Sequence, residues 1–408
     1  MRMATFGLSL FLLVWLKGDG PRHPATNPAI AVLAILPIGL FFHPNTNTIA
    51  AGAAQCVMYA AILAPIFWVR RLKITAKGFQ WLIFLIWGYQ TLSAIFGVLQ
   101  VYFPGQFQPF LSTAIQSSTW GGENLKIVLA NGELVYRPMG LTDTPGGAAG
   151  AGLSALLLGV GIALRERNPI LRVACICSAA IGLFCIYLSE VRSILVMAGI
   201  CLIALAAVLA RKGDFGRVTA ILGGGTALFV TSFTWAIAVG GESTLKRLST
   251  LTSDRADAVY QQNRGHFLED TFNNLLYEYP LGAGLGRWGP ISGYFGDSNN
   301  PVSKPLWAEI QWTGWLYDGG IPLMIAYVAA LYFACRTAWQ IAMSEKLGDF
   351  ALWGALIFGY NIGAVALTFN YALFISQSGM EFWLLNTALF VAAYNEWMER
   401  DRPASRRR

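Results

Sequence analysis

Long apolar runs constrain the possible folds of this chain more than any other feature of its sequence. Most are close to the about 20 residues that an α-helix needs to cross the hydrocarbon core of a bilayer. Eleven such runs occupy residues 4–16, 27–42, 49–69, 79–103, 147–164, 169–188, 192–210, 218–239, 321–342, 350–369 and 378–397. The expected fold class is therefore all-α: a polytopic transmembrane helical bundle of about 11 helices, with residues 1–408 forming a single integral membrane domain.

The composition agrees with this interpretation. Of the 408 residues, 55% are hydrophobic and only 12% are charged, and the mean hydropathy is +0.50, which is typical of a membrane protein. The first run is short and superficially resembles a secretory signal. The residues that follow it, Lys17-Gly-Asp-Gly-Pro21, lack a small-residue cleavage site, so we interpret the run as a retained helix.

The basic residues predict the orientation in the membrane. The clusters at 70–77, 165–172, 211–217 and 400–408 fall on one side when the runs alternate across the bilayer, whereas the connection at 43–48 contains no Lys or Arg. Cytoplasmic loops are enriched in Lys and Arg, so the N-terminus is expected outside and the C-terminus in the cytoplasm. The net charge of +7 is spread over these short clusters, and no nucleic-acid partner is expected.

Two long segments, 104–146 and 240–320, then face outward, and function is expected there. In the first, Asn131-Gly132 joins two strand-like runs, which predicts a hairpin. This hairpin would be either a lid that guides a substrate or a simple addition to the loop.

The second segment, 240–320, is the expected catalytic loop. It is too polar to enter lipid but rich in Trp, Tyr and Gly. We expect an amphipathic helix over 267–279, a glycine-rich turn over 280–290, and an interfacial helix over 307–317 that leads into the next span.

Three arginines are candidates for binding an anion. Arg192 lies in the break Ser189-Glu-Val-Arg-Ser193 between two apolar runs. The alternatives to a functional role are that its side chain snorkels to the membrane interface or pairs with Glu190. Arg264 and Arg287 lie in the second outward segment. Guanidinium groups bind phosphate oxygens through paired hydrogen bonds, so the chemistry favours a phosphate-bearing ligand.

Glu309 is the candidate general base. It lies in Trp307-Ala-Glu-Ile-Gln-Trp312, an otherwise apolar and aromatic stretch, where partial desolvation would raise the pKa of its carboxyl towards a value useful for proton abstraction. Trp312 is expected in the aromatic belt at the membrane interface, close enough to contact a substrate bound there.

Two further polar residues have competing interpretations. Asp318, beside Gly319-Gly320, would contact a substrate or cap the start of the following helix. His266 would act at the site or, as a lone histidine with no orienting partner in the sequence, would serve packing or lie on the surface.

No metal site or cofactor is predicted. The six cysteines all lie in apolar stretches, and Cys175 and Cys177 have no second pair or nearby histidine, so they are interpreted as packing residues. The sequence also lacks a P-loop, a D-x-D pair and a G-x-S-x-G elbow, which disfavours chemistry on soluble nucleotides.

Four stretches match the motifs of a known family in order along the chain. They are Arg137-Pro-Met-Gly-Leu-Thr-Asp-Thr-Pro145, Ser189-Glu-Val-Arg-Ser193, Arg264-Gly-His-Phe267 with Tyr279-Pro-Leu-Gly-Ala-Gly-Leu-Gly286, and Glu309-Ile-Gln-Trp-Thr-Gly-Trp-Leu-Tyr-Asp-Gly-Gly-Ile321. Over about residues 137–330 the chain thus resembles the O-antigen ligase and polymerase family, GT-C-like glycosyltransferases of the bacterial inner membrane. Glu309 stands where the ligases of this family have histidine, and the aromatic residue at 267 is shifted by one place.

The resemblance implies an enzyme that polymerises polyprenyl-diphosphate-linked oligosaccharide repeat units into a surface polysaccharide or exopolysaccharide on the outer face of the membrane. Arg192 and Arg264 would bind the diphosphate, with Arg137 or Arg287 assisting. Glu309 would take the proton of the attacking acceptor hydroxyl, with inversion at the anomeric carbon and without a metal.

The partners implied are the lipid-linked donor, a glycan acceptor, the bilayer, and a chain-length regulator or flippase of the same pathway. Two alternatives remain open. One is an O-antigen ligase that transfers a finished glycan to lipid A core or another acceptor. The other is a lipid-linked glycan transporter, for which Glu381 near the outer end of the last run would belong to a cation pathway.

Overall fold

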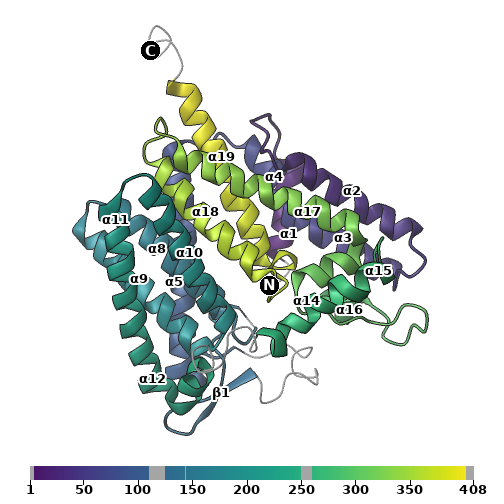
Figure 1. The fold of residues 1–408 in the computed structure, drawn as a ribbon, viewed down its shortest axis with the longest axis horizontal. Helices are drawn as coiled ribbons and strands as arrows, with labels where there is room; N and C mark the ends of the chain where they lie inside the picture. The colour runs from purple at the N-terminus through teal and green to yellow at the C-terminus, as the bar shows by residue number, and fades with distance from the viewer. Residues whose placement is uncertain (1–3, 110–124, 143, 250–259, 401–408) are drawn as a thin grey trace. The chain divides into compact units, whose positions relative to one another are not determined.

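The computed structural model describes residues 4–109, 125–142, 144–249 and 260–400 (Figure 1). The described chain is mostly α-helical and contains one two-stranded sheet. It divides into two compact units. Unit 1 comprises Met1–Ala76, Tyr260–Phe350 and Ala364–Arg408, and unit 2 comprises Lys77–Val259 and Ala351–Gly363. The expectation of a single membrane domain stays a prediction.

Unit 1 is built from the two ends of the chain and the expected catalytic loop. Its elements are α1 (Ala4–Trp15), α2 (Thr26–Phe42), α3 (Ile49–Leu63), α4 (Pro65–Trp68), η1 (Val69–Arg71), η4 (Gln261–Gly265), α14 (His266–Asp270), η5 (Thr271–Leu275), α15 (Leu276–Glu278), α16 (Gly289–Phe295), α17 (Gln311–Met343), η6 (Leu373–Ile375) and α19 (Gln377–Arg400).

Unit 2 contains the middle of the chain. Its elements are α5 (Ala76–Tyr102), α6 (Pro104–Phe107), β1 (Lys126–Val128), β2 (Leu134–Tyr136), α8 (Ala148–Arg165), α9 (Pro169–Ser189), α10 (Arg192–Arg211), α11 (Phe215–Thr219), η3 (Ala220–Gly224) and α12 (Gly225–Ser249). Helix α18 (Phe350–Leu367) contributes residues to both units.

All eleven predicted runs coincide with helices. In the described residues, seven spans are long and apolar enough to cross a membrane, namely Ala76–Tyr102, Ala148–Arg165, Pro169–Ser189, Arg192–Arg211, Phe215–Gly241, Gln311–Met343 and Phe350–Leu367. The bent pair Ile49–Leu63 and Pro65–Arg71, with an angle of 42°, makes an eighth if it forms one span. These apolar helices indicate a membrane protein, in agreement with the composition.

The count of eleven crossings stays a prediction. Helix α1 has 12 residues, which at about 1.5 Å per residue gives a length of about 18 Å, whereas the hydrocarbon core is about 30 Å thick. Helix α2 has 17 residues, and α19 bears several charged residues. The orientation and the outward placement of 240–320 stay predictions as well.

The short helix α1 packs against the bent pair. The Ser9 hydroxyl donates to the Ala61 carbonyl at 2.9 Å. Arg71 Nη1 donates to the carbonyls of Leu13 and Leu16 at 2.6 and 2.7 Å, where the last carbonyls of a helix have no intrahelical partner. A helix this short is marginal in isolation, so these tertiary contacts stabilise it.

The predicted hairpin is present and belongs to the core of unit 2. Strands β1 and β2 are antiparallel, with Ile127 opposite Val135. Both side chains are buried and pack with Phe184 and other apolar residues of the unit. The tip of the hairpin is also hydrogen-bonded to α12, because the Ala130 N–H donates to the Val239 carbonyl at 3.0 Å. The hairpin is therefore more than an addition to a loop.

Helix α17 is interrupted after its first two turns. Gly319 (φ −164°, ψ 18°) and Gly320 (φ 63°, ψ −155°) leave the helical conformation. The positive φ at Gly320 favours glycine, and a Cβ there would collide with the Pro280 carbonyl oxygen. The continuous helix resumes at Ile321, which is where the predicted span 321–342 begins.

The break in α17 is filled by the glycine turn, residues 280–290. The Ala283 N–H donates to the Tyr317 carbonyl at 2.8 Å, and the Ile321 N–H donates to the Pro280 carbonyl at 2.9 Å. These contacts satisfy backbone groups that the interrupted helix cannot pair within itself. The glycine turn is thus a structural partner of α17.

Candidate functional site

The structure brings together two of the three predicted catalytic residues. Arg264 Nη1 and Glu309 Oε2 form a salt bridge, with exposed side-chain fractions of 35% and 20%. Burial lowers the pKa of the Arg264 guanidinium below its ordinary value, but arginine remains protonated at neutral pH. Trp307 Nε1 donates to the other carboxylate oxygen, Glu309 Oε1, at 3.0 Å. The pair is therefore partly desolvated and still reachable from solvent.

Arg264 lies in a helical stretch that hydrogen bonds connect to other parts of unit 1 at its start and near its middle. This stretch runs from η4 through α15 and contains two π-helical turns, at Gln261–Gly265 and Thr271–Leu275. At its start, the Tyr260 hydroxyl donates to the Phe369 carbonyl at 3.1 Å. Further along, the hydroxyls of Thr271 and Thr313 are 2.6 Å apart and both residues are buried. The expected amphipathic helix is thus present and begins earlier than predicted.

Glu309 lies on a non-helical segment, and the predicted helix over 307–317 is wrong for its first residues. Residues 304–309 are not helical, and α17 begins at Gln311. The reason is tertiary: the Gln311 N–H donates to the Thr368 carbonyl at 3.0 Å, and Gln311 Oε1 accepts from the Phe374 N–H at 2.7 Å. Ile310, between Glu309 and Gln311, is fully buried.

Arg287 has a structural position in the glycine turn. Its Nε donates to the Lys304 carbonyl at 2.9 Å, and its Nη1 donates to the Ala283 carbonyl at 2.7 Å. Its own carbonyl accepts from the Leu306 N–H. Arg287 is 6% exposed, so it connects the glycine turn to the segment that leads to Glu309, and its guanidinium is already engaged by backbone carbonyls.

Asp318 is the centre of a buried hydrogen-bond cluster. Its Oδ1 accepts from Trp288 Nε1 at 2.9 Å, and its Oδ2 accepts from Gln55 Nε2 at 2.9 Å and from the Tyr59 hydroxyl at 2.8 Å. We call these four residues, Asp318, Trp288, Gln55 and Tyr59, the Asp318 network. Asp318 is 3% exposed and its carboxylate is engaged by these donors, and its predicted contact with a substrate stays a prediction.

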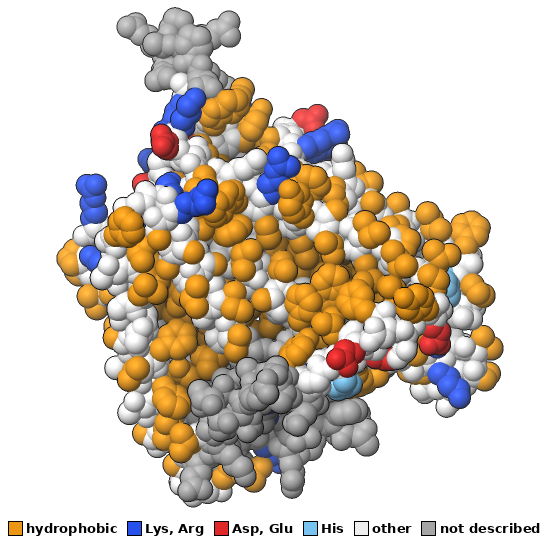
Figure 2. All heavy atoms as spheres, in the orientation of Figure 1, with side chains coloured by type: hydrophobic (Ala, Val, Ile, Leu, Met, Phe, Trp, Pro, Cys, Tyr) orange, Lys and Arg blue, Asp and Glu red, His pale blue; other side chains and the backbone are white. Residues whose placement is uncertain are grey.

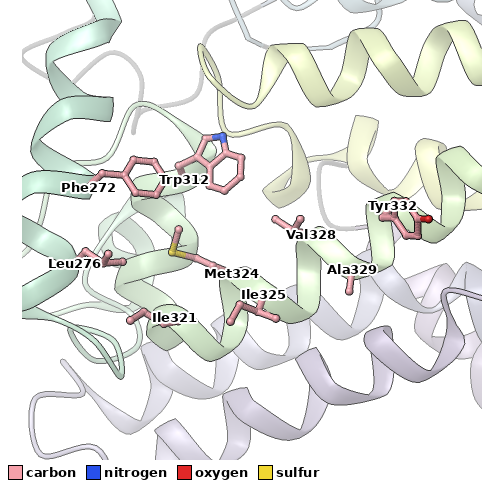
Figure 3. A pocket seen from close by; sticks show the side chains of 9 residues that line it. All are labelled: Phe272, Leu276, Trp312, Ile321, Met324, Ile325, Val328, Ala329 and Tyr332. Carbon is pink, nitrogen blue, oxygen red and sulfur yellow. The ribbon is translucent and has the colours of Figure 1, made fainter.

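Trp312 lies at the end of an apolar pocket on one face of α17 (Figure 3). The pocket has a volume of about 600 Å³. Its lining residues come from η5, α15 and α17, and are Phe272, Leu276, Trp312, Ile321, Met324, Ile325, Val328, Ala329 and Tyr332. None of them is charged. Figure 2 shows the orange apolar surface over α17 to which this face belongs.

His266 is exposed, and its ring contacts that of its neighbour Phe267 at a tilt of 38°, with ring centroids 4.0 Å apart. It starts α14, directly after the π-helical turn that contains Arg264. Nothing in its described contacts orients it as a base, so its predicted role stays a prediction.

Arg137 and Arg192 lie in unit 2. Arg137 follows β2 and precedes a turn held by Gln100, whose Oε1 accepts from the N–H groups of Met139 and Gly140 at 2.8 and 2.9 Å. Arg192 begins α10 two residues after Glu190, which ends α9 in the left-handed conformation with φ 52° and is 3% exposed. Both arginines are half-buried. Their predicted roles in binding the diphosphate stay predictions.

The sequence analysis missed four residues that the structure connects to the site. Trp307 contacts Glu309, and Trp288, Gln55 and Tyr59 contact Asp318. Gln55 and Tyr59 had a detectable pattern, because polar groups four residues apart lie on one face of an apolar helix. Trp288 had none, because an aromatic beside a glycine turn is also typical of a membrane interface.

The comparisons with known proteins give no information on function, so a functional inference rests on the residues described above. The described residues contain no group of three or more His, Cys, Asp or Glu side chains that could hold a metal ion. No protein-family model matches the chain, and no curated protein matches it.

Proposed function

We propose that this membrane protein is a glycosyltransferase that joins polyprenyl-diphosphate-linked oligosaccharide repeat units into a polysaccharide. The salt bridge between Arg264 and Glu309 is the observation on which the proposal rests. It brings a guanidinium, a group whose chemistry suits phosphate oxygens, against a carboxylate, and both groups remain partly exposed. The two groups suit the two tasks in glycosyl transfer from a diphosphate donor, namely stabilisation of the leaving group and removal of a proton from the acceptor.

The reaction follows from these roles. An acceptor hydroxyl oxygen attacks the anomeric carbon of the donor sugar, and its proton passes to a Glu309 carboxylate oxygen. The bond between the anomeric carbon and the diphosphate oxygen breaks, and the polyprenyl diphosphate leaves with the electron pair. Arg264 stabilises the charge on this leaving group. In-line attack inverts the configuration at the anomeric carbon.

The resting salt bridge also implies an order of binding. A carboxylate that is paired with a guanidinium and an indole N–H is a poor proton acceptor. Exposed ion pairs are weak, about 0–1 kcal/mol, and a diphosphate is more highly charged than a carboxylate. Donor binding would therefore draw Arg264 away from Glu309 and release the base for the acceptor.

The apolar pocket supports a lipid-linked donor. Trp312 lines the pocket and lies three positions after Glu309 in the chain. Ile321, Ile325 and Val328 continue the apolar lining along α17 (Figure 3). An uncharged lining of this kind suits an isoprenoid chain, which is apolar and flexible.

One observation favours a transporter as the second candidate. Interrupted helices are typical of the binding sites of transporters, and α17 is interrupted at Gly319 and Gly320. In this protein, however, Tyr317 and Ile321 on either side of the break bond to the glycine turn. A ligase is the alternative within the same class, since it would use the same chemistry with a different acceptor.

Glu309→Gln tests the proposal. The full-length protein in lipid nanodiscs is given a polyprenyl-diphosphate-linked repeat unit, and the glycan lengths are measured by mass spectrometry. The wild type is expected to produce a ladder of lengths, and Glu309→Gln to lower the rate about 100-fold or more. The matched control is Glu269→Gln, the same change at an exposed acid of α14, which should leave the rate unchanged.

Each other outcome has a defined meaning. A single transfer to a separate acceptor would identify a ligase. Movement of the labelled lipid-linked sugar across the bilayer without a new glycosidic bond would identify a transporter. A full rate in Glu309→Gln would refute the assignment of the base.

A further inference from the structure

The Asp318 network connects three segments that are distant in the sequence. Gln55 and Tyr59 come from α3, Trp288 lies in the glycine turn, and Asp318 precedes the break in α17. All four side chains are nearly or completely buried. Buried carboxylates must be satisfied by hydrogen bonds or charges, and the three donors here are neutral. The carboxylate therefore fixes the relative positions of these segments within unit 1.

Trp288 is held in one position by its surroundings. A Cβ at Gly314 would collide with the Trp288 ring, so Gly314 provides the space in which the indole lies. The ring nitrogen then points at Asp318 Oδ1, 2.9 Å away. Trp288 also belongs to an apolar cluster with Ala283 and Tyr317, which joins the glycine turn to the first turns of α17.

A short chain of contacts leads from Trp288 to Glu309. Arg287, the residue before Trp288, bonds to the Lys304 carbonyl through its side chain and to the Leu306 N–H through its carbonyl. Residues 304–306 are thereby attached to the glycine turn. Glu309 follows on the same non-helical segment, whose other end is fixed at Gln311.

We propose that Asp318 is a positioning residue for Glu309, acting through the hydrogen bond from Trp288 and the contacts of Arg287 with residues 304–306. The inference rests on the proposed role of Glu309 as the base, and it assigns to Asp318 a role other than substrate contact. Without the Trp288 hydrogen bond, the glycine turn and residues 304–306 would be held less tightly. The Glu309 carboxylate would then spend less time at the reacting hydroxyl. Misplacement of a catalytic group by about 1 Å costs up to about 100-fold in rate.

The test is a matched pair of substitutions, Trp288→Phe and Trp315→Phe. Both replace a buried indole by a phenyl ring. Trp288→Phe removes the hydrogen bond to Asp318, whereas Trp315 Nε1 has no hydrogen-bond partner among the described residues. In the nanodisc assay we expect Trp288→Phe to lower kcat about tenfold with less than about a twofold change in the KM for the donor. We expect Trp315→Phe to retain kcat within about twofold.

A second comparison separates positioning from a general structural effect. In the Glu309→Gln background, Trp288→Phe should cause no further loss, because the group that it positions is already absent. A further tenfold loss in that background would overturn the inference. Equal kcat values for Trp288→Phe and Trp315→Phe would overturn it too.

If Trp288→Phe does not fold, Tyr59→Phe replaces it. This change removes only one hydroxyl donor to Asp318. A lower kcat with an unchanged KM supports the inference, and an unchanged kcat overturns it. The two proposals fail in distinguishable ways. Full activity of Glu309→Gln refutes the proposed function and this inference with it, whereas loss of activity in Glu309→Gln with none in Trp288→Phe refutes the inference alone.

Discussion

Glu309 and Asp318 lie in the same stretch of chain, on either side of the start of α17, yet their surroundings differ in exposure and in the charge of the groups that face them. Glu309 is partly exposed and faces a cation and one indole N–H. Asp318 is buried and accepts three hydrogen bonds from neutral donors. In a partly exposed ion pair, the cation can exchange the carboxylate for another anion at a small cost in free energy. A buried carboxylate that loses its hydrogen-bond donors strongly destabilises the fold.

The comparison separates a residue suited to chemistry from one suited to structure. A general base must release its resting partners when substrate arrives, and Glu309 can do so. A structural carboxylate must keep its partners, and those of Asp318 come from α3, the glycine turn and α17. The two acids should therefore respond differently to substitution: a change at Glu309 should mainly lower the rate, and a change at Asp318 should also lower the stability.

Replacing each acid by alanine is expected to produce the largest difference. Asp318→Ala leaves three buried donors without an acceptor, and we expect it to lower the free energy of unfolding by about 3 kcal/mol. Glu309→Ala should lower it by less than about 1 kcal/mol, because the pair is partly exposed. Denaturant unfolding of the full-length protein in mixed micelles measures both values. Equal losses would remove the distinction between the two acids.

The break in α17 provides a second test, of intermediate size. Gly320→Ala adds a Cβ at a positive φ and against the Pro280 carbonyl oxygen, so we expect a loss of about 2 kcal/mol in stability. Gly293→Ala in α16 is the control, because nothing lies within 4 Å of its added Cβ and alanine favours a helix. If Gly320→Ala is as stable as Gly293→Ala, the junction of the glycine turn with α17 does not contribute to stability.

Local sequence chemistry predicted the parts of the fold that depend on neighbouring residues. Apolar runs predicted the helices, and Asn131-Gly132 predicted the hairpin. The predicted two-residue turn is wrong, because the pairing of Ile127 with Val135 and the bond from the Leu129 N–H to the Glu133 carbonyl leave three residues, 130–132, in the loop, with a positive φ at Gly132. The break before Ile321 was also detectable, since the predicted span begins there. The packing of the hairpin into unit 2 was not, because it depends on α9 and α12.

The candidate site depends on contacts between distant residues, which explains what the sequence could and could not predict about it. Arg264 and Glu309 were each singled out by residue type and surroundings, but their salt bridge follows from the docking of Tyr260 on Phe369 and of Thr271 on Thr313. The non-helical course of 304–309 depends on the contacts of Gln311 and of Arg287, which the sequence suggested as a phosphate ligand.

The smallest expected effect concerns Trp307, the second resting partner of Glu309. Trp307→Phe removes the donor to Glu309 Oε1 and leaves the Arg264 salt bridge in place. Trp307 is 50% exposed, where water replaces a lost donor, so the kcat of glycan transfer should change by less than about threefold. Trp288→Phe removes the same indole N–H from a buried acid and should have the larger effect. A loss for Trp307→Phe that equals the loss for Trp288→Phe would show that exposure does not distinguish the two carboxylates, because both would then depend on their indole donors to the same extent.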